Sequence, residues 1–135
     1  MADICFRTQA FATDPEGDLE YCNGMPGSRL ANWIRDGLLK KGYSCREPLQ
    51  EDYGWGFWLD ADDCSVWVSA SYAAPDEEDA AGVPEWHVGV DYGFAPWAVR
   101  QWFRKRRGRE LSREVYAHVK EMIASLSEAT IVEED

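Results

Sequence analysis

The chain has 135 residues, of which 45% are hydrophobic and 13% aromatic, and its formal net charge at pH 7 is -11. This length fits a single domain over residues 1–135 with a real core, and the apolar fraction argues against global disorder. The negative charge disfavours nucleic acid as a partner, because binding to a phosphate backbone depends on lysine and arginine. An acidic surface instead suits a basic protein partner that is attracted electrostatically.

The N-terminal stretch MADICFRTQAF has no apolar run that is long enough for a signal peptide or a membrane span. We therefore expect a cytoplasmic protein that does not bind membranes. The four cysteines contain no C-x-x-C pair, whereas zinc sites usually take their ligands in close couples (Cys5, Cys22, Cys45 and Cys64). The sequence therefore predicts reduced, buried thiols, and it contains no motif for a metal or a cofactor.

The N-terminal part of the chain has one strand pattern and one helix pattern. Residues 4–13 alternate weakly and predict a strand, and residues 14–27 are rich in Gly, Pro, Asp and Asn and predict a loop. Ser28 is a favourable N-cap for a helix that ends at Gly42, and apolar residues recur within it at every fourth position (Leu30, Ile34 and Leu38).

Three strand patterns occupy the middle of the chain. YGWGFWLD and CSVWVSASY are separated by turn-forming acids and predict an antiparallel hairpin, and an acidic loop over 74–84 leads to EWHVGVDY at 85–92. A tight turn at Asp62 and Asp63 would pair Trp58 with Trp67. In each strand, alternate residues would then face the core and the residues between them would face outward. The first of these strands places Tyr53, Trp55 and Phe57 on the inner parity.

Two helices are predicted at the end of the chain. The first begins near Pro96 and ends near Gly108, and the second begins at Ser112 and carries an apolar stripe (Leu111, Val115, Val119, Met122, Ile123 and Leu126). The order β-α-β-β-β-α-α predicts an α+β domain with an antiparallel sheet of about four strands and helices on one face. The predicted core combines both layers (Cys64, Val66, Val68, Trp86, Val88, Val90, Leu30, Ile34, Leu38, Val115, Val119 and Met122).

The outer face of this sheet is the predicted binding surface. Its two tryptophans either shield the backbone of Gly54 and Gly56, or form a contact surface for a partner protein or for a second copy in a homodimer. The binding interpretation selects outward residues and neighbouring acids (Trp58, Trp67, Asp60, Asp62, Asp63, His87 and Asp91).

Glu85 and His87 lie two residues apart on the same outer face. A carboxylate at this spacing can orient an imidazole that acts as a base, and Ser69 or Ser71 could supply a nucleophile. No strained nucleophile turn accompanies them. Glu85 and His87 are therefore the catalytic candidates of an enzyme or a small-molecule site.

A basic segment over 100–109 interrupts the acidic chain (Arg100, Arg104, Lys105, Arg106, Arg107 and Arg109). Near a helix C-terminus, such cations interact favourably with the helix dipole, which is the preferred interpretation. The alternative is an anion or nucleic-acid patch in which Trp97 and Trp102 stack on bases.

Together these features favour a small acidic protein-binding module, an inhibitor or immunity-type protein that acts through acidic loops and the tryptophan-bearing face. Its general build is similar to that of small bacterial immunity, antitoxin and inhibitor proteins, in composition and not in sequence. Two alternatives stay open: a small-molecule-binding protein or enzyme that uses the His87 face, and a nucleic-acid mimic whose clustered acids imitate phosphates.

Overall fold

The protein is a mixed α+β structure, and the computed structural model describes residues 2–11, 27–61, 64–73, 83–92, 105–127 and 129–134. Its elements follow the order β1 (Ala2–Arg7), α1 (Ser28–Lys40), β2 (Ser44–Cys45), β3 (Leu49–Glu51), β4 (Gly54–Asp60), β5 (Ser65–Ala73), β6 (Glu85–Tyr92), α2 (Lys105–Ala124) and β7 (Thr130–Glu134). The strands form one seven-stranded antiparallel sheet in the order β2-β4-β5-β6-β1-β7, with β3 also paired to β4. The predicted class is confirmed, and the predicted number of about four strands is too low.

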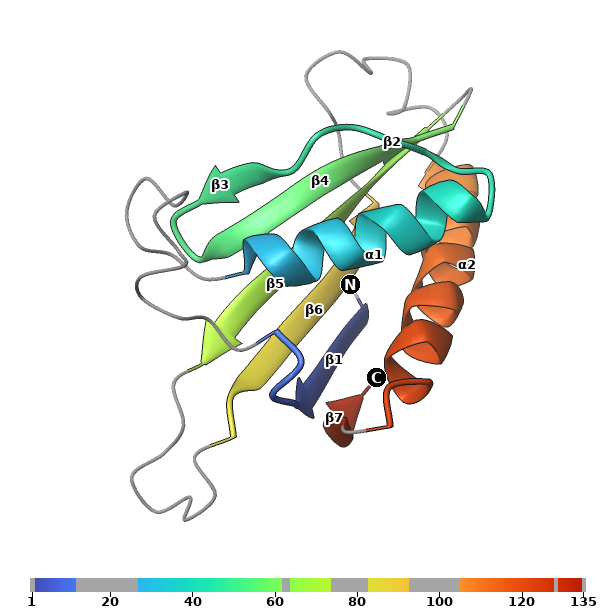
Figure 1. The fold of residues 1–135 in the computed structure, drawn as a ribbon. Helices are drawn as coiled ribbons and strands as arrows, with labels where there is room; N and C mark the ends of the chain where they lie inside the picture. Colours follow the sequence, from blue (N-terminus) through green and yellow to red (C-terminus); the bar gives the residue numbers. More distant parts are fainter. Residues whose placement is uncertain are drawn as a thin grey trace.

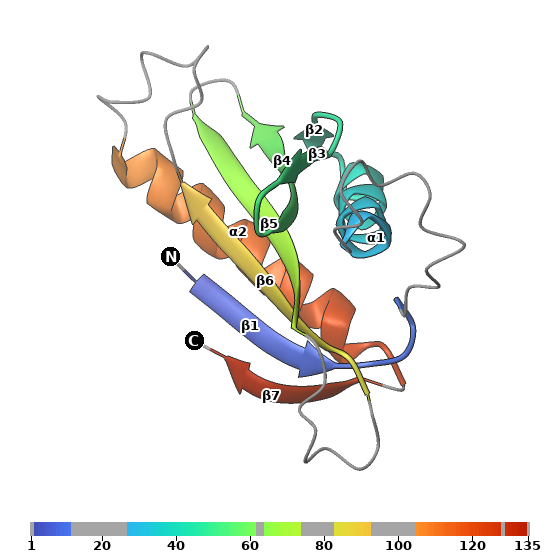
Figure 2. The ribbon, with the colours of Figure 1, turned by 90° about the vertical axis from the view of Figure 1, so that its left-hand side faces the viewer.

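The two helices form a layer on one face of the sheet (Figure 1). α1 contacts β4 and β5, whereas α2 packs mainly on β6. After a turn of 90°, Figure 2 shows the twist of the sheet and both helices on the same side of it. The opposite side of the sheet, called the outer face below, carries neither of the described helices.

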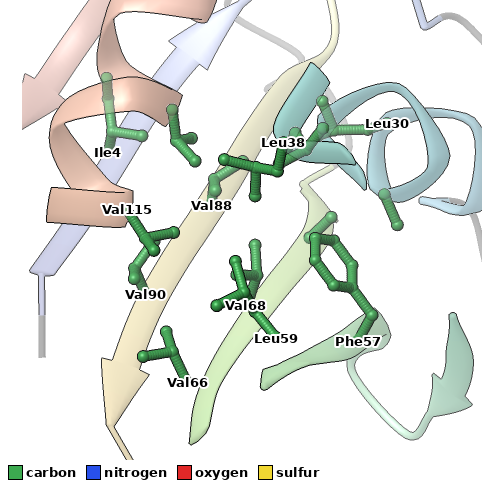
Figure 3. Close-up of a cluster of buried hydrophobic side chains, with 14 of the residues drawn as sticks. Ile4, Leu30, Leu38, Phe57, Leu59, Val66, Val68, Val88, Val90 and Val115 are labelled. Atoms are coloured by element: carbon green, nitrogen blue, oxygen red, sulfur yellow. The ribbon is translucent and has the colours of Figure 1, made fainter. Parts of the chain in front are cut away.

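The three central strands have the predicted register and inner faces. Trp58 pairs with Trp67 and Leu59 pairs with Val66, and the Ala61 amide donates to the Cys64 carbonyl over 2.8 Å. The inner-facing apolar side chains of these strands are buried (Phe57, Leu59, Val66, Val68, Ala70, Trp86, Val88 and Val90). Figure 3 shows this layer meeting α1 at Leu30 and Leu38 and α2 at Val115.

The predicted core is one buried cluster, with Met122 as the exception. Met122 is half-buried, and Ile123 takes the fully buried position beside it. A Cβ added at Gly37 of α1 would lie 2.1 Å from the Met122 Cε atom. Met122 therefore fills the contact between the two helices, where the absent side chain of Gly37 allows them to approach.

The first strand is shorter than predicted. β1 ends at Arg7, and the Thr8 hydroxyl oxygen then accepts a hydrogen bond from the Ala10 amide over 3.1 Å. This local bond turns the chain away from the sheet. Residues 12–26, which include most of the predicted loop, lie outside the described residues.

The ends of α1 differ slightly from the prediction. Ser28 is the first residue of the helix, and Gly27 takes the N-cap position that was expected for Ser28. The helix ends at Lys40, and Gly42, which has a φ of 97°, follows it as expected for a glycine that terminates a helix.

The end of the first predicted C-terminal helix and the whole of the second belong to one continuous helix in the described part of the chain. α2 continues from Lys105 to Ala124 without a break at Gly108, which is buried. A Cβ at Gly108 would lie 3.1 Å from the Tyr92 Cβ, so this glycine permits close packing on β6 instead of ending a helix. The predicted helix start near Pro96 and the centre of the acidic loop, residues 74–82, lie outside the described residues.

Candidate functional site

The outer face brings together several of the predicted site residues. Cross-strand pairing arranges its side chains in rows, of which the first is Gly54, Ser71, His87 and Cys5. The second row is Gly56, Ser69, Gly89 and Asp3, and the third is Trp58, Trp67 and Asp91. The predicted residues Trp58, Trp67, His87 and Asp91 therefore share one face.

Four residues form what we call the aromatic patch: Leu49, Tyr53, Trp58 and Trp67. The ring centroids of Trp58 and Trp67 are 5.0 Å apart with an interplanar angle of 56°. The Trp67 indole N–H donates a hydrogen bond to the Tyr53 hydroxyl over 2.9 Å. Both tryptophans are half-buried, whereas Leu49 and Tyr53 are 51% and 49% exposed. The patch therefore presents apolar and aromatic surface to solvent near β3.

Sequence reasoning missed two members of the aromatic patch. Strand alternation placed Tyr53 on the inner parity, but Tyr53 lies in the turn before β4 and its hydroxyl reaches Trp67. Leu49 belongs to β3, which was not predicted, and pairs with Gly56 on the outer parity. The sequence did offer one indication that Tyr53 lies outside the strand: it directly precedes Gly54, the first residue of β4.

The two glycines of β4 are required for different reasons. A Cβ at Gly56 would lie 2.2 Å from Cζ2 of Trp67, so the indole lies over this glycine as the shielding interpretation predicts. A Cβ at Gly54 would lie 2.3 Å from the Ala70 carbonyl oxygen, and Gly54 has a φ of 156°. Trp67 thus covers Gly56, while Gly54 permits close approach of the β5 backbone.

The acids predicted for binding have different surroundings. Asp60 accepts hydrogen bonds from Arg46 Nε over 2.6 Å and from the Ser65 hydroxyl over 2.7 Å, so its charge is balanced within the fold. Asp91 is half-buried opposite Trp67, and no residue in the described ranges forms an ion pair or hydrogen bond with it. Asp62 and Asp63 lie outside the described residues.

The outer face is acidic in the part of the chain that the structure describes. Its carboxylates are Asp3, Glu51, Asp60, Glu85 and Asp91, and its guanidinium groups are Arg7 and Arg46. An excess of one charge sign over a surface creates a potential that attracts ligands of the opposite sign. This surface therefore favours cationic groups.

The expected contact between Glu85 and His87 forms. Glu85 Oε2 lies 3.1 Å from His87 Nε2, and Glu85 Oε1 lies 3.6 Å from Arg7 Nε. Pairing places Cys5 of β1 and Ser71 of β5 on either side of His87. The row therefore combines a thiol, an imidazole and a hydroxyl, groups that serve nucleophilic and acid–base chemistry.

Cys5 could not be assigned to this row from the sequence, because nothing in it shows that β1 pairs with β6. The other nucleophile candidate, Ser69, lies one row away and donates its hydroxyl to the Gly89 carbonyl over 3.5 Å. Among the described residues, no group of three or more His, Cys, Asp and Glu side chains could hold a metal ion.

The described part of the basic segment, residues 105–109, lies at the start of α2 and not at a helix C-terminus, so the dipole interaction predicted for the segment is not favourable for these residues. Cations in the first turn face the positive end of the helix dipole. Arg109 donates from Nε to the Tyr92 hydroxyl over 3.1 Å, and Arg107 lies 3.8 Å from Glu110. Arg100 and Arg104 lie outside the described residues, and only the backbone of Lys105 and Arg106 is described.

Three cysteines are described, and none of the three forms a disulfide: Cys5, Cys45 and Cys64. Cys64 is buried, whereas Cys5 and Cys45 are half-buried. Burial raises the pKa of the Cys45 thiol to about 11, despite the nearby Arg35 guanidinium, which lowers it. Burial and the Glu114 carboxylate raise the pKa of Tyr43 to about 12.

No helix in the described ranges is both long and apolar enough to span a membrane. Comparison with known proteins finds no similarity: no protein-family model, no curated protein and no solved structure matches the chain significantly. Function is therefore inferred from the fold and from the chemistry of the outer face.

Proposed function

We propose that this chain is a protein-binding module that recognises a basic partner through the outer face of its sheet. The observation that carries the proposal is the aromatic patch, with Trp58 and Trp67 in contact and Tyr53 exposed beside them. Tryptophan and tyrosine are enriched among the residues that dominate binding energy at protein interfaces. Exposed aromatic surface of this kind is typical of a contact site.

The edges of the sheet favour a contact through the face. At one edge, β2 and β3 have two and three residues. At the other edge, the pairing register between β1 and β7 shifts between Cys5 and Phe6, as in a β-bulge. Short strands and bulges both hinder the addition of a further strand. Association through the outer face is therefore better supported than strand addition.

The charge of the molecule favours a basic partner over a second copy. The chain carries a net charge of -11, and carboxylates predominate on the described outer face. Two copies meeting through this face would bring like charges together, whereas a basic protein would gain attraction and a faster association rate. An inhibitor or immunity-type protein would act by covering a basic surface of its target. If that target is a nucleic-acid-binding protein, this chain would act as a nucleic-acid mimic.

Affinity capture from the native host, followed by reconstitution with the purified partner, tests this proposal. The test variant is Tyr53→Ser with Trp58→Ser, which removes exposed aromatic surface and leaves Trp67 over Gly56. The control is Leu39→Ser, which removes an exposed apolar side chain from α1. We expect a basic protein to bind the wild type and the control, to bind the double variant at least about tenfold more weakly, and to dissociate as salt rises.

Equal affinity of the purified partner for all three proteins would contradict the use of the aromatic patch. Light scattering coupled to size-exclusion chromatography supplies a second measurement. We expect a monomer at low and high salt, and a dimer that the Tyr53→Ser, Trp58→Ser variant abolishes would assign the outer face to self-association instead.

The contact between Glu85 and His87 favours a second candidate, a small-molecule site or enzyme that uses Cys5 or His87. If His87 acts as a base toward Cys5, His87→Ala should slow alkylation of that thiol by about tenfold or more. An unchanged alkylation rate, measured by mass spectrometry of the Cys5 peptide, would contradict this candidate.

A further inference from the structure

Trp67 and Asp91 lie directly opposite each other on β5 and β6. The Cβ atoms of such a pair are about 5 Å apart, and both of these side chains are half-buried on the outer face. The indole N–H of Trp67 is occupied by Tyr53. In the described part of the chain no cation pairs with Asp91 or lies over the Trp67 ring. A carboxylate and an aromatic ring therefore lie side by side without a counterion from the described residues.

We propose that Trp67 and Asp91 form a binding site for an arginine side chain of the partner. This inference rests on the proposed function and names the chemical group that the outer face recognises. A guanidinium group can stack on an indole and donate two parallel hydrogen bonds to a carboxylate. An ammonium group attracts both groups as well, but it has no planar surface for stacking.

The same chain holds a guanidinium group of its own two residue pairs further along the hairpin, at Asp60. Arg46 donates its backbone amide to the Trp58 carbonyl over 2.8 Å and its Nε to Asp60 over 2.6 Å. A second guanidinium, that of Arg109, lies 5.7 Å from the centroid of the Tyr92 ring. Trp67 and Asp91 combine the two kinds of group that these internal arginines contact separately, a carboxylate for Arg46 and an aromatic ring for Arg109.

Small residues occupy the next outward positions beside this pair. The next outward residues along β5 and β6 are Ser69 and Gly89, which pair with each other. The Ser69 hydroxyl is directed at the Gly89 carbonyl oxygen, 3.5 Å away. No bulky side chain of these two strands therefore blocks the approach from that side.

Titration of the intact protein with short peptides tests the site, using the indole N–H signals in nuclear magnetic resonance spectra. The probes are acetylated tetra-arginine, tetra-lysine and tetra-citrulline, of which the last keeps the shape of arginine without its charge. We expect tetra-arginine to shift the Trp67 signal, tetra-lysine to bind about threefold more weakly, and tetra-citrulline to cause no shift.

Two variants with the same change in net charge separate the local site from general attraction. Asp91→Asn removes the proposed ligand of the guanidinium, and Asp36→Asn removes an exposed carboxylate from α1. We expect Asp91→Asn to weaken tetra-arginine binding about fivefold and Asp36→Asn to change it by less than about 1.5-fold. Trp67→Leu, which keeps apolar bulk over Gly56, should weaken it about threefold, measured on the indole signal of the neighbouring Trp58.

Equal binding of tetra-arginine and tetra-citrulline, or equal effects of Asp91→Asn and Asp36→Asn, would overturn the arginine site. Those results leave the module proposal standing if the purified partner still depends on Tyr53 and Trp58. The opposite outcome is also informative. If tetra-arginine binds through Asp91 but the partner binds equally well without Tyr53 and Trp58, the arginine site is supported and the use of the aromatic patch is contradicted.

Discussion

The two faces of the central sheet obey different constraints although the same strands build both. On β5, Val66 and Val68 are fully buried under the helices, while Trp67 and Ser69 between them are half-buried on the outer face. The inner parity must be apolar because burying a polar group without a partner is costly. The outer parity has no such requirement in the described structure, so aromatic and acidic side chains can occupy it, and we propose that contacts outside the fold account for them.

The largest expected difference between the faces concerns two adjacent residues of β6. Val88 is fully buried, and His87 beside it is exposed on the outer face. Val88→Asp should destabilise the domain by several kcal/mol and unfold it, because an unpaired charge enters the core. His87→Asp, as the control, should cost less than about 1 kcal/mol in a urea titration. A soluble, cooperatively folded Val88→Asp protein would refute the assignment of the faces.

The two glycines of β4 sharpen the comparison. Gly54→Ala should cost about 3 kcal/mol, because the new methyl group meets the backbone of β5 and the backbone has a φ of 156°. Gly56→Ala should cost about 1–2 kcal/mol, because the atoms nearest to the new methyl group belong to the Trp67 ring and not to the backbone.

A double-mutant cycle provides the check on these two values. Adding Trp67→Ala should recover part of the loss at Gly56 and none of the loss at Gly54. Recovery of stability at both glycines, measured by chemical denaturation, would show that the ring and not the β5 backbone limits the space at Gly54.

Trp67 should affect both stability and association. Trp67→Ser is expected to cost roughly 1–2 kcal/mol through lost cross-strand contact and exposure of Gly56, and to weaken partner binding as well. Trp58→Ser should cost less, because the atoms nearest to Gly56 belong to Trp67 and not to Trp58. A thermal melt and a partner titration on both variants measure the two effects. A large loss of stability with association intact would reject the binding surface and leave only shielding.

The smallest expected effect distinguishes two thiols. Cys45 packs against the inner core, and burial raises its pKa to about 11, whereas Cys5 lies on the outer face. Because the folded pKa is raised, about one thousandth of Cys45 is thiolate at pH 8, and its alkylation should rise tenfold per pH unit until pH approaches about 11. We expect Cys5 to react faster at pH 8 in mass-spectrometric alkylation assays. Faster alkylation of Cys45 would contradict this assignment.

Periodicity predicted the parts of the fold where burial imposes a pattern. The helix over Ser28–Lys40 and the strands Gly54–Asp60, Ser65–Ala73 and Glu85–Tyr92 were found where alternation or a four-residue repeat requires them. β2 and β3 are too short to show a period, and β7 includes a bulged position and two glutamates. Gly108 and Ser112 resembled helix boundaries, but packing on Tyr92 overrides those signals.

The candidate site was predictable within the hairpin and not beyond it. Tight-turn geometry placed Trp58 beside Trp67, and spacing on one strand placed Glu85 beside His87. Cys5 was missed because its position depends on pairing between strands far apart in the sequence. The balanced charge of Asp60 was also missed, since it depends on Arg46 in an unpredicted connection.

The position of β1 has a consequence for how the molecule is made. β1 lies between β6 and β7, so both of its hydrogen-bonding edges stay unpaired until strands from much later in the chain have left the ribosome. Contacts between such distant segments slow folding, and unpaired strand edges are prone to aggregate in the meantime. The apolar residues Ile4 and Phe6 of β1 are then without their core partners. The nascent chain is therefore expected to expose an aggregation-prone β1 until both β6 and β7 have left the ribosome.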